Sequence, residues 1–344
     1  MCRFGVSVLV LLAGCAHLHR AVDGAAIDDK VRLVLTLPPT PAKRPLPWSD
    51  AASLEQVTRP EPLVFTTEPL EQHRLHREGL VQERWSYDSK LKVRFEGSNR
   101  AAVYVYRAGE LGERPIVLWV PGLAVDASAF PAIRGLISEA VDRGADVVFI
   151  VPPYHLERTP PGHGSGDVLM ATDATDHFTA LAQGLQELRS VLAWLVDLHP
   201  PKLGAFAGSM GAAALTRAMS FDGGLDFATL FIPVVAWEDM VFGIARMEPV
   251  RAQLRNAGVP DEEARAMYAA LDGSSTVPPK RAHVSVLAAR YDLIARRAPL
   301  ERLVERWRLK EPVWLESGHA GALLLPSTSR LYAKLLDEDL PRPK

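Results

Sequence analysis

The most constraining stretch of the sequence lies between residues 202 and 218. A short apolar run ends at small residues, a serine follows at position 209, and an alanine-rich segment of helical character continues from it. This change from strand to helix requires a tight turn that holds Ser209 in a strained backbone conformation, with its hydroxyl exposed at the C-terminal edge of the strand. We expect Gly208 and Gly211 to remove side chains that would clash where strand and helix approach each other. Taken alone, the pattern is compatible both with a nucleophilic serine and with a simple connection of small residues between strand and helix, so the flanking segments must decide.

Apolar runs of strand length alternate with segments of helical spacing over most of the chain. Strands are predicted at 90–95, 101–107, 115–120, 145–151, 203–207, 225–232, 284–289 and 313–315, the first two as a hairpin. Helices are predicted at 130–141 and 175–199. Alternation of this kind favours an α/β fold in which helices cover both faces of a mostly parallel sheet. We place one catalytic domain at residues 90–340.

Two long segments interrupt the alternation, near residues 152–174 and 237–279. Long excursions at the C-terminal edge of an open sheet usually build the lid and the substrate pocket, and the second segment has helical pieces. The first contains a distinctive Tyr154-His155 pair and an Arg158-Thr159-Pro160 stretch, for which we expect a role in lining the acyl-group entrance.

The stretch around Ser209 resembles the nucleophile elbow of the alpha/beta-hydrolase superfamily, whose pattern is G-x-S-x-G, with Ala207 in place of the first glycine. The resemblance covers residues 90–336 and implies the alpha/beta-hydrolase fold with a helical lid. It also implies a catalytic triad in the chain order Ser, Asp or Glu, then His. Asp292 follows the strand at 284–289, and His319 follows the strand at 313–315, so these two residues are the predicted acid and base.

Each assignment has an alternative. Asp292 could instead cap the helix that follows it, and a lone histidine is more often structural than catalytic. Glu238 and Asp239 are the reserve acids, because some relatives take the carboxylate from the preceding strand. The resemblance also implies two backbone N–H donors for an oxyanion. The first is that of Met210, and the second is that of Leu123, in the loop after the strand at 115–120.

The N-terminus has the form of a secretory signal. A short apolar core follows Arg3, and Leu12-Ala13-Gly14-Cys15 resembles a bacterial lipobox, which implies cleavage before Cys15 and its lipidation. We therefore assign residues 1–14 to a lipoprotein signal peptide and predict a protein anchored in the bacterial cell envelope. An ordinary signal peptide with a chance cysteine is the alternative.

Between this signal and the catalytic domain we expect two segments. Residues 15–62 are rich in proline and alanine, without a sustained period, and are predicted to be an extended tether. Residues 63–89 form an N-terminal extension, and the part from Glu68 to Trp85 has a partly helical pattern.

These features predict a serine hydrolase of the carboxylesterase or lipase type that acts on a small-molecule or lipid acyl substrate. The net charge of −2 gives no case for nucleic acid as a partner. The two cysteines form no metal-ligand cluster, and His155, His163 and His177 lack a ligand spacing, so we expect neither metal nor cofactor. The same triad could serve a haloperoxidase, a perhydrolase or an acyltransferase. A non-catalytic envelope lipoprotein is the alternative from another class.

Overall fold

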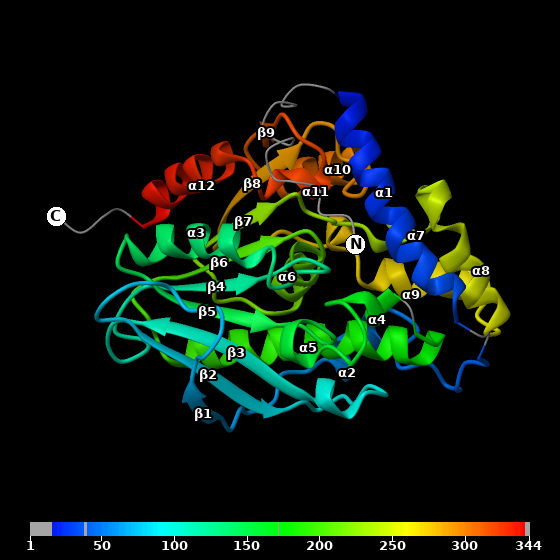
Figure 1. The fold of residues 1–344 in the computed structure, drawn as a ribbon, viewed down its shortest axis with the longest axis horizontal. Coiled ribbons are helices and arrows are strands. Elements are labelled where there is room, and N and C mark those ends of the chain that lie inside the picture. The colour runs from blue at the N-terminus through cyan, green and yellow to red at the C-terminus, as the bar shows by residue number, and fades with distance from the viewer. Residues whose placement is uncertain (1–15, 38–39, 171, 341–344) are drawn as a thin grey trace.

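A nine-stranded sheet forms the centre of the computed structural model, which describes residues 16–37, 40–170 and 172–340 (Figure 1). The strands lie in the order β1-β2-β3-β5-β4-β6-β7-β8-β9. The pairs from β1 to β5 are antiparallel, and all pairs from β5 to β9 are parallel. The bounds are β1 Thr66–Pro69, β2 Val81–Asp88, β3 Arg100–Arg107, β4 Ile116–Val120, β5 Asp146–Val151, β6 Leu203–Gly208, β7 Phe227–Phe231, β8 His283–Ala289 and β9 Val313–Leu315.

Helices cover both faces of this sheet, as predicted. Helices α3 (Phe130–Val141) and α12 (Pro326–Asp339) pack on one face, and α5 (Ala174–Asp197), α6 (Met210–Phe221) and α10 (Arg297–Trp307) pack on the other. Strands β4 to β7 are buried along their whole length, which is why they read as continuous apolar runs in the sequence. The mixed α/β architecture with a mostly parallel sheet is confirmed.

The predicted hairpin is wrong in its first strand. The partner of β3 is β2, at residues 81–88, and not the segment 90–95. That segment is a loop tied down by Asn99, whose side chain accepts a hydrogen bond from the Val93 N–H (2.8 Å) and donates one to the Val93 carbonyl (2.9 Å). The region from Glu68 to Trp85, for which a partly helical pattern was predicted, contributes the second half of β1 and most of β2 instead.

The N-terminal region differs most from the prediction. Where an extended tether was expected, residues 16–35 form helix α1 (Ala16–Leu35), and a second helix, α2 (Ala51–Val57), follows. Helix α1 is held to the domain because Ile27, Val31 and Val34 are buried in the core. The signal peptide and Cys15 lie outside the described residues. Within those residues, no helix is both long and apolar enough to cross a membrane.

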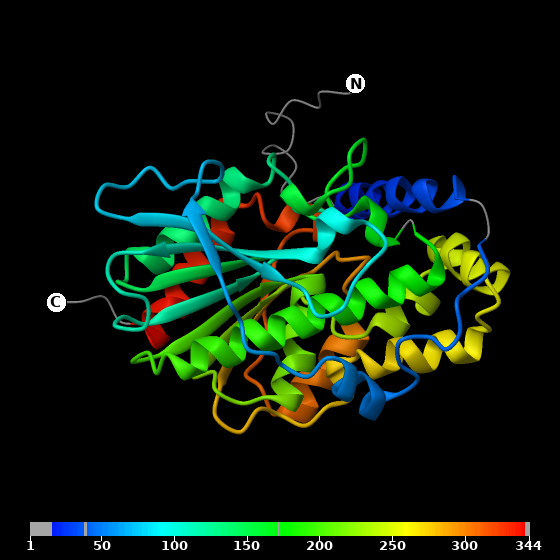
Figure 2. The same cartoon turned by 90° about the horizontal axis from the view of Figure 1, so that it is seen from below.

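The predicted insertions flank the C-terminal ends of the parallel strands. The segment 237–279 holds α7 (Trp237–Gly243), α8 (Glu248–Asn256) and α9 (Asp261–Ala270), and the segment 152–174 holds the short helix α4 (Asp167–Met170). Helix α1 lies beside α4, α8 and the short helix α11 (His319–Ala322), so it bridges the two insertions and the end of the sheet (Figures 1 and 2). Lys30 and Asp28 of α1 form ion pairs with Asp167 and Arg246, respectively.

Candidate active site

Ser209 occupies a sharp turn between β6 and α6. Its backbone has φ 49° and ψ −116°, a conformation that costs a non-glycine residue about 1–3 kcal/mol and is found mostly at functional sites. The turn is held in place from β7, because the Ser209 N–H donates to the Phe231 carbonyl at 2.9 Å. The strain predicted for this serine from the sequence is therefore present.

The two glycines around Ser209 have different roles. A Cβ on Gly211 would lie 2.3 Å from the Val120 carbonyl oxygen, so only glycine lets α6 approach β4 this closely. A Cβ on Gly208 would meet Phe231 at 3.7 Å, an ordinary contact. The expectation that both glycines avoid a clash therefore holds for Gly211 and is wrong for Gly208.

The three side chains predicted as a triad lie in one hydrogen-bonded chain. The Ser209 Oγ lies 2.8 Å from His319 Nε2, and His319 Nδ1 lies 2.8 Å from Asp292 Oδ2. The other oxygen of Asp292 accepts the backbone N–H groups of Ile294 (2.8 Å) and Ala295 (2.7 Å), which fixes the carboxylate. An Nδ1–H tautomer of His319 then leaves Nε2 free to accept the serine proton.

The electrostatics of His319 favour its charged form. Burial of the ring lowers its pKa, but the charge of Asp292, the hydrogen bond to it and the charge of Asp23 together raise the pKa above its usual value. The side chains of His319 and Asp292 are only 10% and 3% exposed. A buried imidazole beside a buried carboxylate can take up a proton from Ser209 without help from solvent.

The reserve acids lie elsewhere, on the first turn of α7. Glu238 forms an ion pair with Arg265, and the Asp239 carboxylate lies 3.3 Å from Arg296 Nη1. Each of them is thus engaged with an arginine. Asp292 is the predicted acid that contacts the His319 imidazole.

The predicted oxyanion donors lie on either side of Ser209. Met210 is the first residue of α6, and Leu123 is in the loop after β4. This loop touches the nucleophile, since a Cβ on Gly122 would lie 2.9 Å from the Ser209 Cβ. Ser209, Leu123 and His319 line one cavity of about 170 Å³, whose other walls are mainly apolar side chains from β4, β6, β7 and the loop after β4.

Sequence reasoning singled out His155 but missed its role, which is to secure this loop. Its Nε2 accepts the Ala124 N–H at 3.1 Å, and its Nδ1 donates to the Pro153 carbonyl at 2.8 Å. The ring is fully buried, and this burial lowers its pKa to about 4, so the neutral form is held. Ala124 itself has a positive φ of 63°, and such a conformation needs support from its surroundings.

Arg158, in the same distinctive segment, supports the fold rather than the acyl-group entrance. Its guanidinium forms an ion pair with Glu187 of α5 at 2.7 Å, and both side chains are 1% exposed. It also donates to the Val151 carbonyl, at the end of β5 (2.6 Å). The arrangement fastens the segment after β5 to the helix beneath it.

The three histidines considered for a metal do not form a site. His177 binds the Leu169 carbonyl and the Tyr268 hydroxyl, His155 is engaged as described, and His163 is exposed. Within residues 16–37, 40–170 and 172–340, no group of three or more potential metal ligands occurs.

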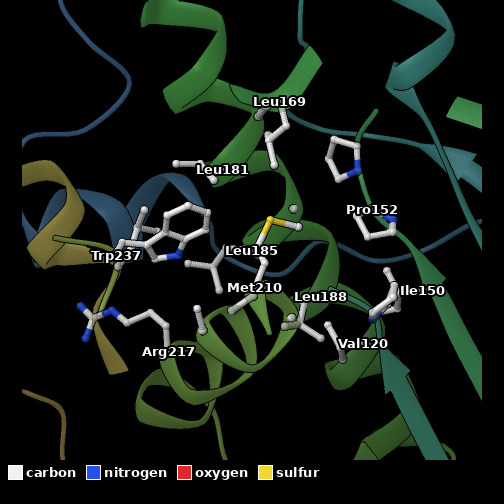
Figure 3. Close-up of a pocket in the computed structure, with 18 residues that line it drawn as sticks. Val120, Ile150, Pro152, Leu169, Leu181, Leu185, Leu188, Met210, Arg217 and Trp237 are labelled. Carbon is white, nitrogen blue, oxygen red and sulfur yellow. The ribbon is translucent and has the colours of Figure 1, made fainter. Parts of the chain in front are cut away.

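A second cavity, of about 60 Å³, lies behind the elbow (Figure 3). Met210 projects into it, and the leucines of α5, Trp237 of α7 and Pro152 surround it (Figure 3). Pro121 lines both this cavity and the cavity at Ser209. Met210, the residue after Ser209, therefore contacts an apolar cavity that is separate from the one lined by Ser209.

Comparison with known proteins identifies the fold. No protein-family model matches the sequence, and no curated protein matches it either. The structure is similar to an acetyl xylan esterase from Paenibacillus sp. R4 (TM-score 0.59, 13% identity, 89% of this chain and 98% of that chain). It is also similar to an S-formylglutathione hydrolase from Agrobacterium tumefaciens (TM-score 0.54, 16% identity, 82% of this chain and 99% of that chain). An acylaminoacyl peptidase from Pyrococcus horikoshii matches with a TM-score of 0.54 and 10% identity over 78% of this chain and 43% of that chain.

The chain therefore has the alpha/beta-hydrolase fold, as the resemblance around Ser209 implied. At these identities the likeness concerns the fold, and the chemistry must be argued from the site.

Proposed function

We propose that this protein is a serine hydrolase that cleaves carboxylic esters through an acyl-enzyme intermediate. The observation that carries the proposal is the hydrogen-bonded chain from Ser209 through His319 to Asp292, with 2.8 Å at both links. The strained elbow that presents Ser209 supports it. The esterases and hydrolases among the structures of the same fold are consistent with this chemistry.

The reaction follows from the geometry. Ser209 Oγ attacks the acyl carbonyl carbon while its proton passes to His319 Nε2, and the negative charge on the carbonyl oxygen faces the N–H groups of Met210 and Leu123. The C–O bond then breaks, and the alcohol leaves with the proton from His319. Water, deprotonated by His319, then attacks the acyl carbon; the bond to Ser209 Oγ breaks, His319 returns the proton to Oγ, and the carboxylic acid is released. Asp292 stabilises the imidazolium in both halves of the reaction.

The walls of the cavity at Ser209 indicate which kind of acyl group fits there. They are mainly apolar, which favours an uncharged acyl group over a charged one, because a charge there would lose its hydration without gaining a partner. We therefore place the protein among carboxylesterases and lipases. A transferase or perhydrolase would use the same acyl-enzyme, with an alcohol or peroxide in place of water as the acceptor.

A fluorophosphonate probe tests the proposal directly, since it labels only an activated serine. We expect one label per chain on Ser209 and none on the Ser209→Ala variant, whereas Ser220→Ala, near the other end of α6, should label normally. Absence of labelling on the folded wild-type protein would overturn the proposal and favour the alternative of a non-catalytic protein. Product analysis with a p-nitrophenyl ester, with and without methanol or peroxide, then separates hydrolysis from acyl transfer.

Envelope anchoring is the second part of the proposal, and it rests on Leu12-Ala13-Gly14-Cys15. We propose that Cys15 is lipidated after cleavage and that the membrane is a partner through this anchor. The variant Cys15→Ser should leave the membrane fraction or remain unprocessed, while Cys2→Ser should behave like the wild type. An unchanged mature mass and unchanged partition of Cys15→Ser would overturn it.

A further inference from the structure

We propose that Asp23, on the N-terminal helix α1, is a positioning residue that fixes the His319 and Asp292 loops relative to each other, so that α1 completes the active site. The inference rests on the proposed function, because it concerns the same triad. It gives a role to a segment that the sequence predicts to be a tether.

The contacts of Asp23 reach both catalytic loops. Its Oδ2 accepts the N–H of His319 at 2.9 Å and the N–H of Leu293 at 3.1 Å, and its Oδ1 accepts the N–H of Ala320 at 3.0 Å. One carboxylate thus joins the residue that follows Asp292 to the backbone of His319 itself. The Asp23 residue is fully buried, so all three hydrogen bonds are shielded from water.

The carboxylate is placed where a helix cap is missing. Helix α11 begins at His319, and the residue before it is Gly318, which has no side chain to cap the helix. Asp23 supplies the acceptor from a distant part of the sequence, and its negative charge suits the N-terminal end of a helix. A Cβ on Gly318 would lie 2.9 Å from both Asp23 carboxylate oxygens, so the glycine makes room for this contact.

A neighbouring residue of α1 reinforces the contact. The His19 ring stacks on Tyr291, which precedes Asp292, with centroids 5.7 Å apart. The His19 carbonyl oxygen would lie 3.0 Å from a Cβ on Gly318. Two successive turns of α1 therefore hold the loops that carry the acid and the base.

Asp23 also affects His319 through its negative charge, in addition to the hydrogen bonds that position it. Burial lowers the His319 pKa, while the Asp292 carboxylate and, to a smaller extent, the Asp23 carboxylate raise it. The other charged or titratable groups around these loops are His19 and Arg20 on α1, Arg290 and Tyr291 after β8, Glu316 before α11, and Arg246 beside Gly24. Arg290 and Tyr291 both bind Glu316, which places that carboxylate in a separate cluster.

The test compares Asp23→Asn with Asp28→Asn on the same helix. Asp28 pairs with Arg246 on the surface, so it is a matched control for substitution in α1. For Asp23→Asn we expect kcat for a p-nitrophenyl ester to fall about 10- to 100-fold, because the reacting side chains are no longer aligned. KM should stay within about threefold of the wild type, because the substrate cavity is unchanged. The acid limb of the kcat/KM profile should move to lower pH, because a negative charge near the imidazolium is removed.

Two outcomes would overturn the proposal. One is a kcat within twofold of the wild type; the other is a lower kcat with an unmoved acid limb, which would indicate a purely structural role. If Asp23→Asn does not fold, Asp23→Ser, which keeps one acceptor, carries the same expectation. Failure of this inference is distinguishable from failure of the proposed function, because in the first case the wild type still hydrolyses the ester and labels with the fluorophosphonate. In the second case, the wild type does neither.

Discussion

The Ala124 N–H donates to the Nε2 of His155 at 3.1 Å, and this bond joins the loop beside the nucleophile to the segment after β5. Ala124 has a positive φ, and a Cβ on Gly166 would lie 2.6 Å from the same Nε2, so the surroundings leave His155 little freedom. Because Leu123 precedes Ala124, we expect the orientation of the proposed oxyanion donor to depend on a histidine that does not line the cavity at Ser209.

The first prediction concerns this support. His155→Leu removes the acceptor for Ala124, so the oxyanion loop should lose its fixed orientation, and kcat should fall about 10- to 100-fold, less than the loss of a whole oxyanion donor. His163→Leu, in the same segment but exposed, should keep at least half of the wild-type kcat. Steady-state kinetics of the two variants provide the measurement, and equal losses in both would contradict the assignment.

The second prediction concerns the pH dependence of stability. The folded-state pKa of His155, about 4, lies below the ordinary 6.5, so below pH 6.5 the unfolded chain binds the proton more tightly than the folded one. Stability from the neutral ring is therefore complete above pH 6.5 and is lost as the pH falls towards 4, in total on the order of 3 kcal/mol. His155→Gln does not titrate. We therefore expect the free energy of unfolding of the wild type to fall by about 2 kcal/mol more than that of His155→Gln when the pH is lowered from 7.5 to 5. Urea unfolding measures both, and an equal pH dependence of the two proteins would contradict this.

The third prediction separates the candidate acids. Asp292→Asn should lower kcat by about 10⁴-fold, the scale expected when the base is held in the wrong tautomer. Asp239→Asn, which disturbs only the contact with Arg296, should lower it less than about threefold. Ester hydrolysis assays decide the matter, and the reverse order of effects would assign the acid to α7.

The fourth prediction tests whether Ser209 and His319 act as one unit. Ser209→Ala and His319→Ala should each abolish nearly all acyl-enzyme formation, and the double variant should be hardly worse than either, because removing one partner already idles the other. The residual rate could still exceed that in water by about 10³, through the oxyanion donors and binding. Single-turnover measurements should show this; losses that multiply would mean that the two residues act independently.

The fifth prediction concerns the elbow glycines. Gly211→Ala places a methyl group 2.3 Å from the Val120 carbonyl oxygen, so β4 and α6 must move apart, and we expect a loss of more than about 3 kcal/mol in the free energy of unfolding. Gly208→Ala meets Phe231 at an ordinary distance and should change stability by less than about 1 kcal/mol. Chemical denaturation of both variants tests the contrast, and similar stability of the two would refute it.

The sequence contains enough information for the parallel half of the sheet and for the three residues of the hydrogen-bonded chain. Strands β4 to β7 are buried on both faces and so read as apolar runs, and Asp292 and His319 come directly after β8 and β9. Residues 90–95 were wrongly predicted as a strand because they alternate between apolar and polar side chains, but they form a loop that is hydrogen-bonded to Asn99.

The support of the site could not be predicted in this way. His155 and Asp23 act on backbone N–H groups, and a backbone donor leaves no side-chain pattern in the sequence. Asp23 moreover lies 296 residues before His319, whose N–H it accepts. A proline-rich stretch follows α1 directly and gives the whole region the composition of a linker.

The distance in sequence between Asp23 and its partners has a consequence for how the chain folds. The hydrogen bonds of Asp23 must wait for segments far downstream, because their donors at 293 and 319–320 are in place only after the loops that carry them have folded. Contacts between such distant segments form late, since their loop-closure entropy is recovered only when most of the domain is in place. The proposed active site is then completed late in folding, so a partly folded chain holds Ser209 without a positioned His319 beside it.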